Sequence, residues 1–159
     1  MSERHPIIAI TGSSGAGTTS VTRTFDNIFR REGVQAAVIE GDSFHRYDRK
    51  EMKLRQAEAE KAGNKNFSHF GPENNLFAEL EQLFRSYAET GTGKRRKYLH
   101  DPEEAAPYKQ DPGTFTPWED VPGDTDLLFY EGLHGAVVTP EINIARHPDL
   151  LIGVVPVIK

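Results

Sequence analysis

The sequence predicts an α/β fold, a mostly parallel sheet with helices on both faces. Short apolar runs alternate with segments of helical periodicity, and several of the runs end at a glycine or a carboxylate. Residues 7–10 are wholly apolar, as in a strand that is buried on both faces. Residues 1–159 are predicted to form one domain, because 159 residues suit one ordinary domain and 36% hydrophobic content is at the low end for building a core.

A strand, a loop and a helix are predicted in the first thirty residues. Apolar side chains recur at helical spacing over residues 18–32, and Gly33 is the residue type that commonly ends a helix. Residues 36–39 predict a second strand that leads to Asp42. Asp42 is therefore expected at the carboxyl end of a strand, where open α/β sheets bind ligands.

The middle of the chain is more polar. Residues 49–62 predict a solvated surface helix, and residues 72–91 predict a helix that begins at a proline and ends at a glycine. One face of the second helix is apolar, and its side chains are expected to pack in the core. They are Leu76, Leu80, Leu83, Phe84 and Tyr87. Residues 94–100 and 108–118 indicate edge strands or an ordered loop, with Trp118 packed beneath that loop.

The last third of the chain predicts two more strands. Residues 126–132 form an apolar strand that ends near Glu131, a short helix is expected after Pro140, and residues 150–158 form another apolar run. No helix follows that run, although a parallel strand normally has a returning crossover. We therefore expect a fragment that is truncated at its C-terminal end.

The amino-acid composition argues against several classes of function. A net charge of −5 disfavours a basic nucleic-acid binder, and the absence of cysteine excludes thiol chemistry and disulfides. The longest apolar run is much shorter than the roughly 20 residues of a membrane helix. We expect a soluble, cytoplasmic protein without nucleic-acid or membrane partners. Four histidines show no metal-ligand spacing: His5, His69, His134 and His147.

Residues 12–19, with the sequence GSSGAGTT, have the context of a phosphate-binding loop between a strand and a helix. Glycines let backbone N–H groups turn towards phosphate oxygens, and the helix adds its free amides and the positive end of its dipole. Thr19 stands where the motif's hydroxyl binds Mg²⁺, whereas Thr18 replaces the usual lysine. An ordinary glycine-rich turn is the alternative.

Two carboxylates support the phosphate site. Glu131 lies at the end of one predicted strand and Asp42 follows another, so both should reach one edge of the sheet. Glu131 could hold Mg²⁺, and Asp42 could take the proton of an acceptor hydroxyl during phosphoryl transfer. Alone, either residue could be a solvated strand-end side chain, which is the less favoured reading.

Five strings in the sequence together resemble the bacterial phosphoribulokinases. They are residues 12–19, 40–46 (EGDSFHR), 66–70 (NFSHF), 98–101 (YLHD) and 129–137 (FYEGLHGAV). The resemblance covers nearly the whole chain and includes threonine at position 18. It implies a P-loop nucleoside triphosphate hydrolase-like sheet and transfer of phosphate from ATP to ribulose 5-phosphate in the Calvin cycle, giving ribulose 1,5-bisphosphate and ADP.

The resemblance also implies roles for individual residues. The expected ATP-binding residues are Gly12, Ser13, Ser14, Gly15, Ala16, Gly17, Thr18, Thr19 and Ser20. Asp42 is the implied catalytic base, Glu131 is a second catalytic acid, and both would hold Mg²⁺ together with Thr19. The implied sugar-phosphate contacts are His45 and Arg49, with Lys53, Tyr98 and His100 as weaker candidates. Residues 94–97, a basic run, are expected to be a solvated edge outside the site.

The resemblance further implies a homo-oligomer, commonly an octamer, that is controlled by NADH and AMP. A uridine-kinase-like nucleoside kinase and a non-catalytic nucleotide-binding module are the alternatives. Members of the resembled family continue beyond the position of Lys159 with a charged segment that closes over the phosphates. We therefore expect the 159-residue chain to be weakly active or inactive alone.

Overall fold

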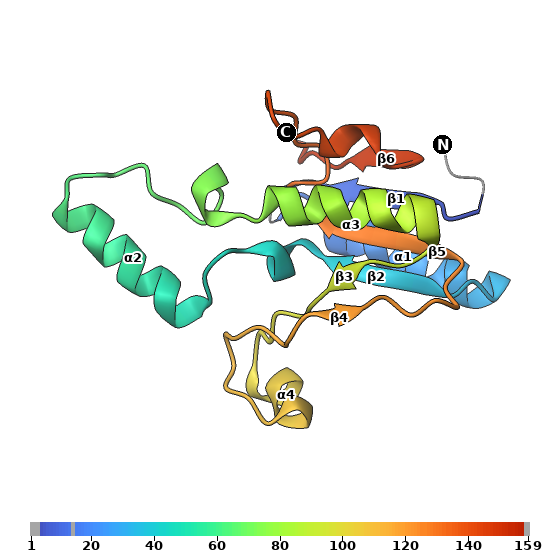
Figure 1. Ribbon diagram of the computed structural model, residues 1–159, viewed down its shortest axis with the longest axis horizontal. Helices are drawn as coiled ribbons and strands as arrows, with labels where there is room; N and C mark the ends of the chain where they lie inside the picture. Colours follow the sequence, from blue (N-terminus) through green and yellow to red (C-terminus); the bar gives the residue numbers. More distant parts are fainter. Residues whose placement is uncertain (1–3, 14, 158–159) are drawn as a thin grey trace.

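A four-stranded parallel sheet forms the centre of the computed structural model, which describes residues 4–13 and 15–157 (Figure 1). Its strand order is β2-β5-β1-β6, and every pairing is parallel. The strands are β1 (Ile7–Thr11), β2 (Ala36–Glu40), β5 (Leu127–Gly132) and β6 (Leu150–Gly153). This arrangement confirms the predicted α/β class.

Two helices cover opposite faces of the sheet. In Figure 1, α3 (Phe77–Thr90) lies in front of the sheet and α1 (Thr18–Glu32) lies behind it. Phe29 of α1 meets Phe129 of β5 with ring centroids 5.4 Å apart, and Phe84 of α3 meets Tyr130 at 5.6 Å. Because successive strand residues point to opposite faces, neighbouring aromatic residues of β5 anchor one helix each. The prediction of helices on both faces is confirmed.

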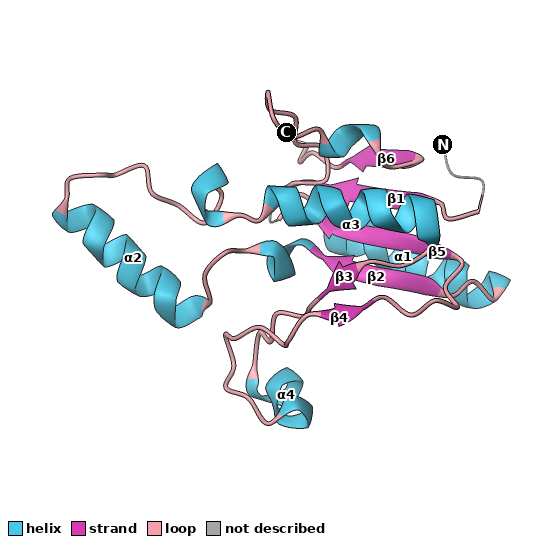
Figure 2. Ribbon diagram, viewed as in Figure 1, coloured by secondary structure: helices cyan, strands magenta, loops and turns pink. Residues whose placement is uncertain are grey.

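The remaining elements lie around this core. The helix α2 (Arg49–Lys61) stands apart from the sheet in Figure 2 and buries only Met52, which confirms the predicted surface helix. A separate antiparallel pair consists of β3 (Lys94–Arg95) and β4 (Glu119–Asp120), and α4 (Pro102–Ala105) lies between them in sequence. In the part of the chain that the structure describes, no helix is long and apolar enough to cross a bilayer.

Two predicted boundaries were wrong. The α-helix expected from Pro72 begins at Phe77, because Asn75 is extended and its side-chain amide donates to two backbone carbonyls of the preceding loop. The strand expected over residues 150–158 ends at Gly153; Ile158 lies outside the described residues. The short helix expected after Pro140 is present as a 3₁₀ helix, η4 (Ile144–Arg146).

Tyr87→Phe is expected to lower the free energy of unfolding by about 1 kcal/mol, the usual net value of one hydrogen bond. Tyr87 is fully buried on α3, and its hydroxyl lies 2.8 Å from the Thr125 hydroxyl ahead of β5. Urea titration measures the change, with Tyr108→Phe as a control because the Tyr108 side chain is 41% exposed. Equal stability of the two variants would show that the Tyr87–Thr125 hydrogen bond contributes nothing.

Candidate active site

The predicted phosphate loop connects β1 to α1. Gly15 and Gly17 have φ angles of 81° and 104°, a conformation that side chains other than glycine rarely adopt. Gly12 N–H donates to the Gly132 carbonyl at 3.2 Å and so ties the start of the loop to the end of β5. No side chain caps the first turn of α1 among the residues described, so that turn's amides are suited to bind an anion. Ser14 lies outside the described residues.

A cavity of about 390 Å³ lies at the carboxyl ends of the central strands. Its walls bring together the phosphate loop and both predicted strand-end carboxylates. The lining residues are Gly12, Ser13, Gly15, Thr18, Thr19, Glu40, Gly41, Asp42, Phe70, His100, Glu131, Gly132 and Leu133. Seven predicted site residues do not line it: Ala16, Gly17, Ser20, His45, Arg49, Lys53 and Tyr98.

Strand register explains why the carboxylates meet. Glu40 of β2 pairs with Glu131 of β5, and Asp42 follows in the 3₁₀ turn η1 (Gly41–Phe44). Glu40 was not predicted as a site residue, although it opens the EGDSFHR string. Burial raises the pKa of Glu40 against the lowering effect of the nearby His100. The edge of the sheet therefore presents three carboxylates to one cavity.

His100 lies between two carboxylates. Its Nε2 is 3.1 Å from Asp42 Oδ2, and its Nδ1 is 3.0 Å from Glu104 Oε2. Ionised carboxylates only accept hydrogen bonds, so this geometry favours the imidazolium, in which both ring nitrogens donate. Partial burial opposes that charge, but the hydrogen bonds to Asp42 and Glu104 outweigh burial and raise the pKa of His100.

Glu104 was missed by the sequence analysis. Its carboxylate accepts from the His100 backbone N–H at 2.9 Å as well as from the ring, and these bonds lower the pKa of Glu104. The Asp101 side chain caps α4 by accepting from Glu104 N–H at 2.9 Å. The YLHD string was the available signal, since Asp101 is a typical helix N-cap three residues before Glu104.

Three other predicted sugar-phosphate contacts lie next to Asp42 or His100 but do not line the cavity. His45 Nε2 is 3.9 Å from Asp42 Oδ1, and burial lowers the pKa of His45, which favours its neutral form. Arg49 donates to the His100 carbonyl at 2.8 Å, and the Tyr98 ring packs edge-on against His100 with centroids 4.8 Å apart. Lys53 is exposed on α2 and does not reach the cavity.

The donor chemistry of the cavity suits a hard divalent cation. Thr19, Asp42 and Glu131 provide a hydroxyl and two carboxylates on its walls, which are oxygen donors of the kind that Mg²⁺ prefers. Within residues 4–13 and 15–157, no cluster of three or more His, Asp or Glu side chains is arranged to hold a metal ion. A cation here would thus take further ligands from water and phosphate oxygens.

The basic run 94–97 is not uniformly solvated. Lys94 and Lys97 are exposed, but the Arg96 guanidinium lies 3.6 Å from the Phe115 ring centroid and 4.5 Å from that of Trp118. Burial lowers the pKa of Arg96 to about 10. The solvated-edge prediction was therefore wrong for Arg96, because aromatic residues about twenty positions later cover it.

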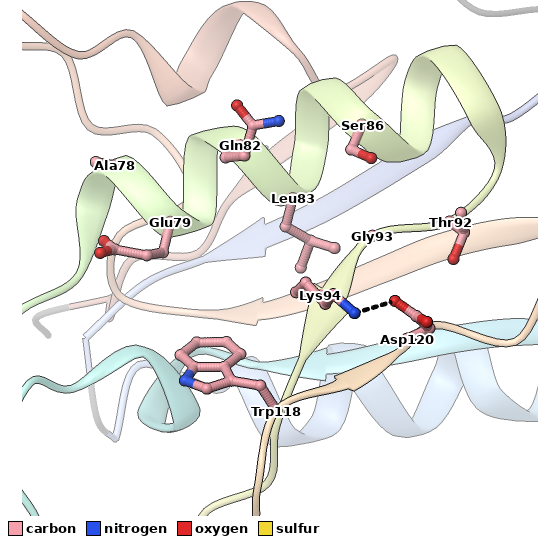
Figure 3. Close-up of a pocket in the computed structure, with 10 residues that line it drawn as sticks. All are labelled: Ala78, Glu79, Gln82, Leu83, Ser86, Thr92, Gly93, Lys94, Trp118 and Asp120. Carbon is pink, nitrogen blue, oxygen red and sulfur yellow. Dashed lines mark ion pairs between the residues drawn. The ribbon is translucent and has the colours of Figure 1, made fainter.

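Trp118 also faces a second cavity, of about 560 Å³, between α3 and the β3–β4 pair (Figure 3). Leu83 projects from α3 toward this space, and the Lys94–Asp120 ion pair, 2.6 Å long, lies beside it. The indole packs edge-on against Phe44 at 5.7 Å yet remains 41% exposed. The predicted packing role of Trp118 thus applies to only part of its ring.

Comparisons with known proteins agree with this geometry. The model of the phosphoribulokinase / uridine kinase family matches residues 7–159. Across all 159 residues, the chain is 78% identical to the chromosomal phosphoribulokinase of Cupriavidus necator and 66% identical to the phosphoribulokinase of Nitrobacter vulgaris. It covers 54% and 55% of them respectively, so it spans about half the length of these curated relatives.

Solved structures support the fold. A phosphoribulokinase from Rhodobacter spheroides superposes with a TM-score of 0.86 at 54% identity, covering 97% of this chain and 52% of that one. A possible uridine kinase from Bacillus stearothermophilus gives a TM-score of 0.59 at 16% identity, over 96% of this chain and 72% of that one. The second likeness concerns the fold alone.

Proposed function

The chain belongs to the phosphoribulokinase / uridine kinase family, and from this premise we propose that it forms the nucleotide- and acceptor-binding part of a phosphoribulokinase. The proposed reaction transfers the γ-phosphate of ATP to ribulose 5-phosphate and yields ribulose 1,5-bisphosphate and ADP. The observation that carries the proposal is the convergence of the phosphate loop, Asp42 and Glu131 on one cavity. The names of the high-identity relatives favour this acceptor over a nucleoside.

Each part of the cavity has a task in this reaction. The amides of the loop and of the first turn of α1 bind the phosphates of ATP. Asp42 accepts the proton of the acceptor hydroxyl while that oxygen bonds to the γ-phosphorus and the bond to the bridging oxygen of ADP breaks. Mg²⁺, held by Thr19, Asp42 and Glu131, would offset the negative charge that develops on the transferred group.

Two cationic side chains, one lining the cavity and one hydrogen-bonded next to it, can bind the sugar phosphate. His100 contributes its imidazolium, and Arg49, which is hydrogen-bonded to the His100 backbone, contributes a forked guanidinium. Thr18 leaves the phosphate loop without its usual lysine, so these cations and the metal carry the electrostatic stabilisation in the described chain.

The deciding experiment is ATP-dependent phosphate transfer by the native gene product, checked for length by mass, with ribulose 5-phosphate and uridine tested side by side. Turnover with ribulose 5-phosphate alone supports the proposal. Turnover with uridine would instead assign a nucleoside kinase, and nucleotide binding without any transfer would assign a binding module. Octameric assembly, control by NADH and AMP, and a cytoplasmic location stay predictions of the resemblance.

Arg49→Ala is expected to raise KM for ribulose 5-phosphate about 10- to 100-fold while KM for ATP changes less than about threefold, the pattern of a lost charge-assisted phosphate contact. Initial rates with each substrate varied in turn measure both constants. Arg55→Ala is the matched control, since Arg55 lies on the same helix but stacks over Tyr47 at 4.4 Å. An equal rise in both KM values would remove Arg49 from the sugar-phosphate site.

A further inference from the structure

We propose that Arg96 is a positioning residue for phosphoryl transfer, which fixes the backbone turn that presents Asp42 to the cavity. The inference rests on the proposed function, because it concerns the base of that reaction. Neither the sequence motifs nor the lining of the cavity includes Arg96. Its role follows from where its guanidinium donates.

The guanidinium holds two carbonyls of the segment that carries Asp42. Arg96 Nε donates to the Ser43 carbonyl at 2.8 Å, and Arg96 Nη2 donates to the His45 carbonyl at 2.6 Å. The carbonyl between them, that of Phe44, accepts from Leu76 N–H at 2.7 Å. Three consecutive carbonyls directly after Asp42 are therefore fixed, two of them by one side chain.

Asp42 depends on this backbone for its position. Its side chain is 56% exposed, so apart from the hydrogen bond with His100 little besides the backbone holds the carboxylate. The turn is tied at its start by Ser43 Oγ, which donates to the Glu40 carbonyl at 2.7 Å. Arg96 ties its end. Removing Arg96 would free the Ser43 and His45 carbonyls, while the Glu40 and Leu76 contacts and the Arg46 N–H bond to the Asn74 carbonyl would remain. The turn would then have more freedom, and the Asp42 carboxylate could shift with it.

The environment of Arg96 suits a fixed donor. The Phe115 and Trp118 rings lie within cation–π distance of its guanidinium, and Trp118 also packs on Phe44 of the turn. A planar guanidinium can stack on rings and donate in two directions at once, which the point charge of lysine cannot do. Arg96, the two rings and the turn thus form one packed unit.

The test compares Arg96→Ala and Arg96→Lys with Arg95→Ala. Arg95 is the matched control, because it is the same residue type one position earlier and pairs instead with Glu119 at 3.3 Å. We expect both Arg96 variants to lower kcat about 10- to 100-fold, as displacements near 1 Å do, with KM for ATP within about threefold. Guanidinium ions at low millimolar concentration should partly restore kcat in Arg96→Ala but not in Arg95→Ala.

A second readout does not depend on activity. Amide hydrogen exchange over residues 41–46 should accelerate at least about tenfold in the Arg96 variants and not in Arg95→Ala, relative to the unsubstituted chain. Emission of Trp118, the single tryptophan of the chain, should shift in the Arg96 variants because the cation leaves its ring. If the native gene product without substitutions transfers no phosphate, the proposed function fails and the exchange measurement alone decides the role of Arg96.

Other outcomes overturn the inference. Unchanged kcat in folded Arg96→Lys and Arg96→Ala would show that the turn holds Asp42 without Arg96. Loss of kcat without faster exchange at residues 41–46, or without rescue by guanidinium, would exclude the positioning role. If Arg96→Ala does not fold, Arg96→Lys decides by the same criteria, and failure of both to fold would assign Arg96 a purely structural role.

Discussion

Asp42→Asn is expected to lower kcat for phosphoryl transfer about 10²- to 10⁴-fold, the range that general bases contribute, while ATP still binds. The amide cannot accept the proton of the acceptor hydroxyl. Its oxygen can still accept the hydrogen bond from His100 Nε2, which lies 3.1 Å from the carboxylate, so the geometry around the cavity should persist. Steady-state rates with ribulose 5-phosphate measure kcat, and calorimetric titration with a non-hydrolysable ATP analogue measures binding.

The control for this substitution is Asp124→Asn, which changes the same chemical group on an exposed loop before β5. The control should keep kcat within about twofold, as surface substitutions usually do. A normal kcat in Asp42→Asn would remove Asp42 from the role of base. If the native gene product binds nucleotide but shows no turnover even without the substitution, the alternative of a non-catalytic nucleotide-binding module would apply instead.

The functional residues that lie at the ends of strands were predictable from the sequence. A buried strand, a glycine-rich loop and a helix predict a phosphate site locally, and parallel strands deliver their carboxyl ends to one edge. Asp42 and Glu131 could therefore be placed together before any contact was known, and the cavity does bring them together with the loop. Their catalytic and metal-binding roles remain predictions.

The supporting residues were not predictable because their roles depend on distant segments. Arg96 belongs to a run of four basic residues, and nothing local shows that Phe115 and Trp118 cover it. Glu104 lies on the short helix α4, and the only local signal for that helix is its N-cap residue, Asp101. Periodicity also misplaced the start of α3, since Asn75 uses its side chain to hold the preceding loop.

A close backbone contact makes the carboxylate edge possible. Gly41 follows β2, and Gly132 ends β5 directly beside it. A Cβ built on Gly41 would lie 2.9 Å from Gly132 Cα and 2.7 Å from the Tyr130 hydroxyl. Tyr130 is fully buried, and its hydroxyl accepts from His134 N–H at 3.3 Å, so neither obstacle can move freely. Only glycine lets Asp42 and Glu131 flank this contact.

Gly41→Ala is accordingly expected to lower kcat about 10²-fold and the free energy of unfolding by about 1–3 kcal/mol, because the added methyl group forces the ends of β2 and β5 apart. Both carboxylates flank the displaced backbone, so the base and the metal-associated acid move together. Initial rates and urea titration measure the two effects. Gly123→Ala is the control, since its Cβ would meet nothing within 4 Å. A Gly41→Ala protein as active and as stable as Gly123→Ala would mean that the strand ends can separate without disturbing Asp42 and Glu131, and that the close contact does not set their geometry.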